Sequence, residues 1–153
     1  HTRYIGDWSS DVCSSDLSDK AKFVSAYTAS GLTPDGSSTY FLAKHVGLLR
    51  AKELFLTNRM LSAEEAKQWG FVTEVVAHDN LTTKANELAI QLASGPTKAY
   101  GGVKRMLLSS FSSPIESQLD NETRHIVGTM DTHDGPHGLN AFLNKERPRF
   151  TGS

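Results

Sequence analysis

The chain has 153 residues, 38% of them hydrophobic and 22% charged, which is enough for one domain with a buried core. Its 16 Lys and Arg residues and 17 Asp and Glu residues give a net charge of -1. This balance lacks the broad positive charge of a dedicated nucleic-acid binder. No apolar run approaches the roughly 20 residues of a bilayer crossing, and a single cysteine cannot form an internal disulfide. The composition predicts a globular cytoplasmic protein with no nucleic-acid or membrane partner.

Residues 1–17 read HTRYIGDWSSDVCSSDL and show no apolar period of a helix or a strand. No apolar stretch follows Arg3, so the segment does not fit a signal peptide. A DNA sequence that resembles a sequencing-library adapter translates in frame to these residues, whereas the alternative is a natural disordered N-terminus. We therefore predict a non-native leader over residues 1–17, which is set aside from the fold. Setting it aside removes Cys13, one basic and three acidic residues, leaving 15 basic and 14 acidic residues.

The next part of the chain begins with a predicted short strand over residues 22–26. A turn over residues 26–36 follows, because Pro34 fixes its own backbone and Gly31 and Gly36 permit a positive φ. Ser37 or Ser38 can cap a helix that ends at Gly47.

The apolar spacing predicts a second helix over residues 48–57, with Ala51, Leu54 and Phe55 on one face. Ser62 and Glu65 have the spacing of a capping box and predict a two-turn helix that Gly70 ends. Residues 71–76, FVTEVV, are rich in β-branched side chains and predict a strand.

Helices are predicted for most of the remaining chain. Asp79 or Asn80 can cap the first of them, and Gly95-Pro96 ends it. The others are expected over residues 98–108, from Ser113-Pro114 to Met130, and from a capping Asp134 to the residues before Arg147-Pro148. One or two strands and about six helices do not form a complete layered fold. We therefore predict residues 18–153 to be the C-terminal, mainly helical half of a larger α/β domain.

Common catalytic and metal-binding motifs fail to fit this sequence. It has no GxSxG elbow and no complete phosphate-binding loop. His133 and His137 have helical spacing, but Gly135-Pro136 lies between them and no third ligand is evident, so no metal is predicted. The basic cluster of Lys145, Arg147 and Arg149 fits either a phosphate contact or a solubilising tail.

Tyr27 and Asp35 flank the predicted 26–36 turn. A carboxylate on a rigid turn just before a helix is suited to act as a base or a nucleophile, and the helix dipole favours its ionised form. The alternative is that Asp35 only caps the helix that begins near Ser37.

The residues from about Ser18 to the C-terminus resemble the enoyl-CoA hydratase/isomerase, or crotonase, superfamily. The resemblance lies in the AxF strand, the Gly-x-x-Pro turn, the LSAEEA helix start, the WGFVTEVV step and the C-terminal DGPHGLNAFLNKERPRFTG. It implies a crotonase-like α/β spiral fold whose C-terminal part, about residues 97–150, forms homotrimers or hexamers built as dimers of trimers.

The resemblance implies an acyl-CoA substrate, no further cofactor, and an oxyanion hole that stabilises a thioester enolate. Hydratases of the family have a glutamate where this chain has Tyr27, which argues against simple hydration. The position of Asp35 is acidic in the enoyl-CoA isomerases, including epoxyphenylacetyl-CoA isomerase-like members, where it moves a proton. Asp35 is therefore the predicted catalytic residue. The residues predicted to bind substrate are Ala26, Tyr27, Leu32, Pro34, Phe142 and Lys145.

Several alternatives stay open. The 4-chlorobenzoyl-CoA dehalogenases have an aromatic residue and an aspartate at the positions of Tyr27 and Asp35, and there the aspartate acts as a nucleophile. A hydratase, or a non-catalytic oligomerisation module, is also compatible with the sequence. The resemblance places both oxyanion-hole segments before Ser18. We therefore expect the chain to be inactive alone and to expose apolar faces. The sequence departs from the family pattern at His137, where family members often have a glutamate.

Overall fold

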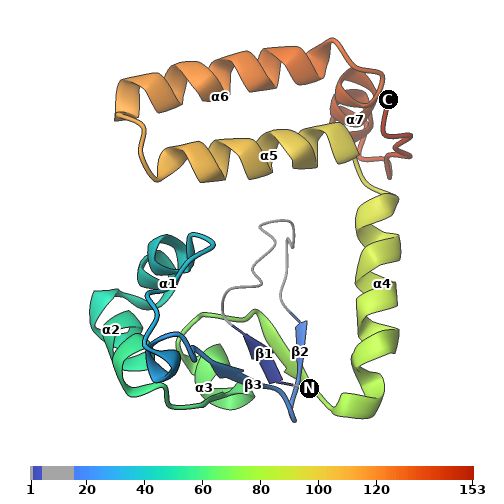
Figure 1. Ribbon diagram of the computed structural model, residues 1–153. Coiled ribbons are helices and arrows are strands. Elements are labelled where there is room, and N and C mark those ends of the chain that lie inside the picture. The colour runs from blue at the N-terminus through green and yellow to red at the C-terminus, as the bar shows by residue number, and fades with distance from the viewer. Residues whose placement is uncertain (1, 5–15) are drawn as a thin grey trace. The chain divides into compact units, whose positions relative to one another are not determined.

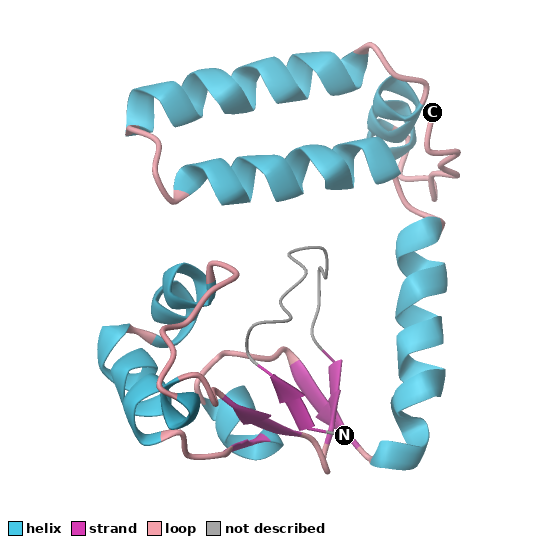
Figure 2. Cartoon of the chain, viewed as in Figure 1, coloured by secondary structure: helices cyan, strands magenta, loops and turns pink. Residues whose placement is uncertain are grey.

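The computed structural model describes residues 2–4 and 16–153 (Figures 1 and 2). The chain divides into two compact units, His1–Ala85 and Asn86–Ser153, and each is described by itself below. Most of the predicted leader, residues 1–17, lies outside the described residues, so that interpretation stays a prediction. Within the described part, no helix is both long and apolar enough to span a membrane.

The first unit contains two small groups of strands. Strand β3 (Lys22–Val24) lies between β1 (Thr2–Tyr4), to which it is parallel, and β4 (Leu61–Ser62), to which it is antiparallel. Strands β2 (Asp16–Ser18) and β5 (Glu74–Val76) form a separate parallel pair. The expectation of one or two strands was too low for the described residues. Strand β1 and most of β2 lie in the segment set aside, and β4 is too short to show a sequence pattern.

Three helices of the first unit confirm the sequence predictions. They are α1 (Ser38–Val46), α2 (Leu48–Thr57) and α3 (Ala63–Gln68). Ser62 and Glu65 form both hydrogen bonds of the predicted capping box, and Gly70 follows α3 with a φ of 72°.

A single apolar core joins these helices to the strands. Leu54 of α2 and Leu61 of β4 are fully buried at its centre, and the Phe23 and Phe71 rings meet edge to face with centroids 5.1 Å apart. The buried face of α2 consists of Ala51, Leu54 and Phe55, the apolar residues whose helical spacing predicted it.

Both predicted strands of this unit are shorter than expected. The first ends at Val24 instead of residue 26, and the chain then forms a 3-10 helix, Thr28–Ser30. The second covers only Glu74–Val76. The backbone N–H groups of Phe71 and Val72 donate to the Ala66 carbonyl at 2.8 and 3.4 Å, which ties both residues to the end of α3. Their apolar side chains enter the core from this position, so the apolar pattern reflected burial and not strand pairing.

The second unit is helical. A 3-10 turn, His78–Asn80, leads into α4 (Leu81–Ala93), which spans the boundary between the units. Helices α5 (Thr97–Ser110) and α6 (Ile115–Met130) lie side by side, and α7 (Asp134–Leu143) follows (Figure 1). The buried Gln118 links α6 to α5 through hydrogen bonds with Ser109 Oγ and the Met106 carbonyl.

Helix caps in this unit differ from the predictions. Asp134 is the first residue of α7 instead of its cap, and its carboxylate binds the C-terminal tail. His133 occupies the cap position without a side-chain capping bond, and the Thr132 hydroxyl accepts from the Gly135 N–H. Before α6, Pro114 occupies the cap position, and no side chain caps that helix. The difference at Asp134 arises because tail N–H groups, which only folding brings near, compete for its carboxylate.

Candidate functional site

The 26–36 turn brings Tyr27 and Asp35 into direct contact. The Tyr27 hydroxyl donates to Asp35 Oδ1 at 2.8 Å. The Tyr27 side chain is half-buried against the apolar core, whereas Asp35 is exposed. The turn therefore presents a carboxylate to the surroundings while an aromatic ring seated on the core holds one of its oxygens.

Backbone hydrogen bonds set the path of this turn. The Tyr27 carbonyl accepts from the N–H groups of both Ser30 and Leu32, each at 3.0 Å. Gly31 follows the short 3-10 helix with a φ of 71°, in the left-handed region that glycine adopts at little cost. This reversal returns the chain toward Tyr27, as the glycine in the sequence predicted.

Asp35 is attached to helix α1 through its backbone and not through its carboxylate. Its carbonyl accepts from the Ser38 N–H at 3.0 Å and from the Ser38 hydroxyl at 2.7 Å. Ser38 is buried, while Ser37, the other predicted cap, makes no side-chain capping bond. The Asp35 carboxylate therefore contacts Tyr27 and makes no capping bond to α1, which differs from the capping alternative.

The contact with Asp35 changes the acidity of the phenol. The hydrogen bond to the carboxylate, followed by burial and the negative charge of Asp35, raises the pKa of Tyr27 above its ordinary value. Each of these effects disfavours the phenolate. Tyr27 is thus a neutral hydrogen-bond donor at physiological pH.

The other predicted site residues fall into two groups. Ala26 and Pro34 are half-buried in the same turn, and Leu32 is 63% exposed there. Phe142 and Lys145 belong to the second unit, where Phe142 is 78% exposed on α7 and Lys145 follows it with a φ of 58°. The structure therefore joins Ala26, Leu32 and Pro34 to the Tyr27–Asp35 pair within one turn.

Sequence reasoning missed two residues that fix this turn, Thr28 within it and Asn58 at the end of α2. Asn58 Oδ1 accepts from the Ala29 N–H at 3.2 Å and lies 3.0 Å from the Thr28 hydroxyl oxygen. The one available signal was the identity of Asn58, because asparagine is, after glycine, a common residue just past a helix end.

A second polar cluster holds the C-terminal tail on α7. The carboxylate of Asp134 accepts from the N–H groups of Thr151 and Gly152 at 2.9 and 2.7 Å. Burial by itself raises the pKa of this carboxyl, but the two N–H groups and the contacts with His133 and the Thr151 hydroxyl outweigh it and lower the pKa to about 2. Asp134 is therefore a structural carboxylate that stays ionised.

The two histidines of helical spacing, His133 and His137, are in contact with residues around the start of α7. The rings of His133 and His137 stack with centroids 5.7 Å apart. His133 Nδ1 contacts Asp134, and His137 Nε2 accepts from the Arg149 N–H at 3.1 Å. Across residues 2–4 and 16–153, no group of three or more His, Cys, Asp or Glu side chains is arranged to hold a metal ion.

Comparison with known proteins identifies the family of this chain. The family model described as enoyl-CoA hydratase/isomerase matches residues 13–153. The chain therefore belongs to the enoyl-CoA hydratase/isomerase family, whose members need no cofactor beyond the CoA thioester substrate.

Individual relatives carry different activities in their names. The chain is 38% identical over 132 residues to 1,2-epoxyphenylacetyl-CoA isomerase of Escherichia coli K12, covering 86% of the chain and 50% of that protein. It is 34% identical over 128 residues to 4-chlorobenzoyl coenzyme A dehalogenase-1 of an Arthrobacter species, covering 84% and 46%. The crystal structure of an enoyl-CoA hydratase from Bacillus anthracis superposes with a TM-score of 0.89 at 28% identity, covering 99% of the chain and 60% of that structure. The chain thus spans about half the length of the curated relatives it matches.

Proposed function

We propose that this chain forms the C-terminal part of an enoyl-CoA double-bond isomerase in which Asp35 moves the proton. The observation that carries the proposal is the exposed Asp35 carboxylate, held through Oδ1 by the Tyr27 hydroxyl at 2.8 Å. In the part of the chain that the structure describes, Oδ2 has no hydrogen-bond partner. This oxygen is free to accept a proton from a substrate carbon.

The chemistry needs one carboxylate and a stabilised enolate. Asp35 takes a proton from the carbon next to the thioester carbonyl, and the electron pair is delocalised onto the carbonyl oxygen as an enolate. Hydrogen-bond donors of an oxyanion hole stabilise that oxygen. Asp35 then returns the proton to the far end of the conjugated system, so the double bond moves and no atom is gained or lost.

The Tyr27 phenol argues for isomerisation over hydration. Adding water to a double bond needs a base that activates the water molecule. A phenol whose pKa is raised by Asp35 is neutral at physiological pH and donates a hydrogen bond instead. Asp35 is the only carboxylate of the 26–36 turn, and one carboxylate suffices for proton transfer.

Substrate binding and assembly complete the proposal. Ala26, Leu32 and Pro34 line the acyl group beside Asp35 in the first unit. Phe142 and Lys145 stay predicted substrate-binding residues of the second unit. Large exposed apolar side chains on α5, α6 and α7 support a homotrimer or a dimer of trimers in the complete enzyme. They include Leu107, Leu108, Ile115, Leu119, Ile126 and Leu143. The cytoplasmic location stays a prediction from composition.

The decisive experiment uses the full-length enzyme that contains this chain. With 3-enoyl-CoA as substrate, formation of the conjugated 2-enoyl-CoA is followed by ultraviolet absorbance. Replacing Asp35 by Asn should reduce kcat by about 10²- to 10⁴-fold, because general acid–base catalysis is lost while the shape is kept. Binding of the CoA ester, measured by calorimetry, should not change. The matched control is Asp79→Asn, at an exposed aspartate outside the turn.

Other outcomes identify the alternatives. Full turnover by the Asp35→Asn variant would show that the assignment is wrong. Chloride release from 4-chlorobenzoyl-CoA, with Asp35 attacking the aryl carbon, would identify a dehalogenase. Water addition to crotonyl-CoA would identify a hydratase. A trimer by light scattering that binds no acyl-CoA would indicate a non-catalytic module.

A further inference from the structure

Asn58 has an unusual backbone conformation for a residue with a side chain. It ends helix α2 with φ 53° and ψ 22°, in the left-handed region, and its N–H donates to the Leu54 carbonyl at 3.2 Å. Glycine adopts this conformation with less strain, and asparagine tolerates it better than most residues. Asparagine at this position therefore adds a carboxamide where glycine would adopt the backbone conformation more readily.

The Asn58 carboxamide contacts the beginning of the 26–36 turn. Its Oδ1 accepts from the Ala29 N–H at 3.2 Å, and because a backbone N–H only donates, the facing atom is the oxygen. The Thr28 hydroxyl lies 3.0 Å from the same oxygen and donates to the Phe55 carbonyl at 2.6 Å. These contacts attach the 3-10 helix Thr28–Ser30 to the end of α2.

A short path leads from this attachment to Asp35. Thr28 follows Tyr27 directly, and the Tyr27 carbonyl holds the next turn through Ser30 and Leu32. A rotation of the 3-10 helix would move the Tyr27 backbone and with it the phenol that holds Asp35 Oδ1. The orientation of the carboxylate thus depends on a contact made some distance from it.

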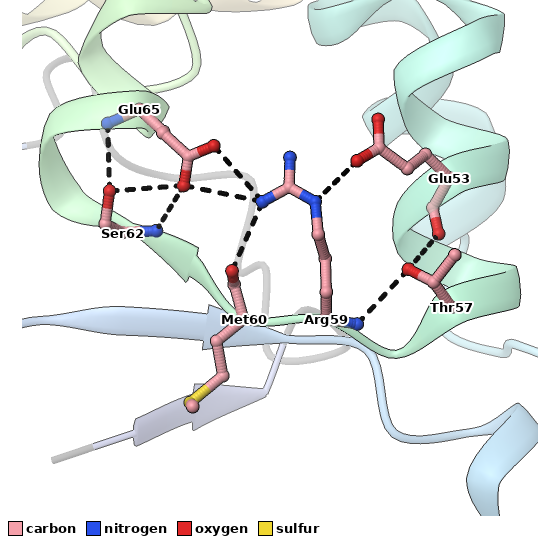
Figure 3. A network of polar contacts seen from close by, with 6 residues as sticks. All are labelled: Glu53, Thr57, Arg59, Met60, Ser62 and Glu65. Atoms are coloured by element: carbon pink, nitrogen blue, oxygen red, sulfur yellow. Dashed lines mark hydrogen bonds and ion pairs between the residues drawn. The ribbon is translucent and has the colours of Figure 1, made fainter.

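Arg59, which follows Asn58 in the chain, makes a network of polar contacts with both neighbouring helices (Figure 3). The Arg59 guanidinium donates to Glu53 of α2 at 2.5 Å, to Glu65 of α3 at 3.2 Å and to the Met60 carbonyl at 3.3 Å. Its charge also lies 5.2 Å from the centre of the Trp69 ring. Asn58 therefore lies in a connection between α2 and α3 that the contacts of Arg59 hold in place.

We propose that Asn58 is a positioning residue for Asp35: its carboxamide oxygen clamps the 3-10 helix and, through Tyr27, sets where the carboxylate lies. This inference rests on the proposed function, in which Asp35 moves the substrate proton. A displacement of about 1 Å at a catalytic group can cost about 10²-fold in rate, so the clamp contributes to kcat and not to CoA binding.

Two substitutions in the full-length enzyme separate the clamp from the backbone conformation. Asn58→Gly keeps the left-handed backbone, which glycine favours, and removes the acceptor oxygen. Asn58→Asp keeps an acceptor oxygen in nearly the same shape. We expect Asn58→Gly to lower kcat by about 10- to 100-fold with KM for the CoA ester unchanged. Asn58→Asp should keep most of the wild-type kcat.

Two further measurements need no turnover. In Asn58→Gly, amide hydrogen exchange at Ala29 should become faster. A titration followed by the ¹³Cζ signal of tyrosine should show the pKa of Tyr27 moving down toward its ordinary value as its contact with Asp35 loosens. Asn58→Asp should preserve both wild-type readings.

The outcomes distinguish the clamp from the proposed reaction. If the wild-type enzyme does not isomerise enoyl-CoA, the proposed function fails, and the Ala29 and Tyr27 readings still test the clamp. If Asn58→Gly had the same kcat and the same Tyr27 pKa as the wild-type enzyme, the clamp would be overturned. Equal impairment of both variants would also overturn it, because the oxygen would then not be the feature that matters.

Discussion

The first unit is held by an apolar core, and the second is held to a larger extent by polar contacts. Ten apolar residues of the first unit, including Leu54 and Leu61 at 0% exposure, form one cluster. In Asn86–Ser153, all of which the structure describes, Ala141 is the only buried hydrophobic residue. Two buried polar side chains make contacts there instead. Gln118 joins α6 to α5, and Asp134 joins α7 to the C-terminal tail.

This difference bears on how each unit supports function. A close-packed core gives the Tyr27–Asp35 pair a rigid base, because close-packed interiors transmit small displacements. The second unit leaves apolar side chains on α5, α6 and α7 exposed. The first unit therefore supports the Tyr27–Asp35 pair on a packed apolar core, whereas the second buries few of its apolar side chains.

The largest effect is expected at the centre of the core. Replacing Leu54 by Ala should reduce the free energy of unfolding by about 2–5 kcal/mol, because it removes buried methyl groups and leaves a cavity. The control variant Ile90→Ala, on α4 at 70% exposure in the second unit, should change it by less than about 0.5 kcal/mol. Urea denaturation followed by circular dichroism measures both. Equal losses would contradict the contrast between the units.

A smaller effect is expected from the polar link in the second unit. Gln118→Ala removes hydrogen bonds to Ser109 and to the Met106 carbonyl, and should cost about 1–2 kcal/mol. Faster hydrogen exchange in α5 and α6 should accompany the loss. Thr123→Ala, an exposed change on the same helix, is the control and should leave exchange unchanged. If Gln118→Ala were silent, apolar contacts would be the main support of this helix pair.

The smallest effect is expected at Asp134 and depends on pH. Its folded pKa of about 2 lies below the ordinary value of 3.8, so the ionised carboxylate stabilises the folded state. That contribution is fully present above the ordinary pKa and is lost as the pH falls toward 2. Asp134→Asn should therefore make Tm less dependent on pH in this acid range.

The control for this titration is Asp120→Asn, which removes an exposed carboxylate that pairs with Arg124 on α6. Thermal unfolding followed by circular dichroism across the acid range measures all three proteins. An unchanged acid slope in Asp134→Asn would mean that the tail contacts do not depend on the charge of this carboxyl.

Local interactions made much of the fold predictable. The bounds of α1 and α2 and the Ser62–Glu65 capping box follow from neighbours three or four residues apart. The pairing of Tyr27 with Asp35 was also within reach, because Gly31 and Pro34 between them specify a turn that brings its two ends together. The sequence resemblance likewise led to the family, which the family model confirmed over residues 13–153.

Only the tertiary structure decided contacts between distant residues that compete with local ones. Phe71 and Val72 have the pattern of a strand, yet hydrogen bonds to Ala66 and burial in the core place them outside it. Asp134 has the pattern of a helix cap, yet the N–H groups of Thr151 and Gly152 bind its carboxylate. Asn58 meets Thr28 and Ala29 across about 30 positions of the chain. A local pattern states which hydrogen bonds a residue can make, and the folded chain selects among them by bringing a better or less exposed partner within reach.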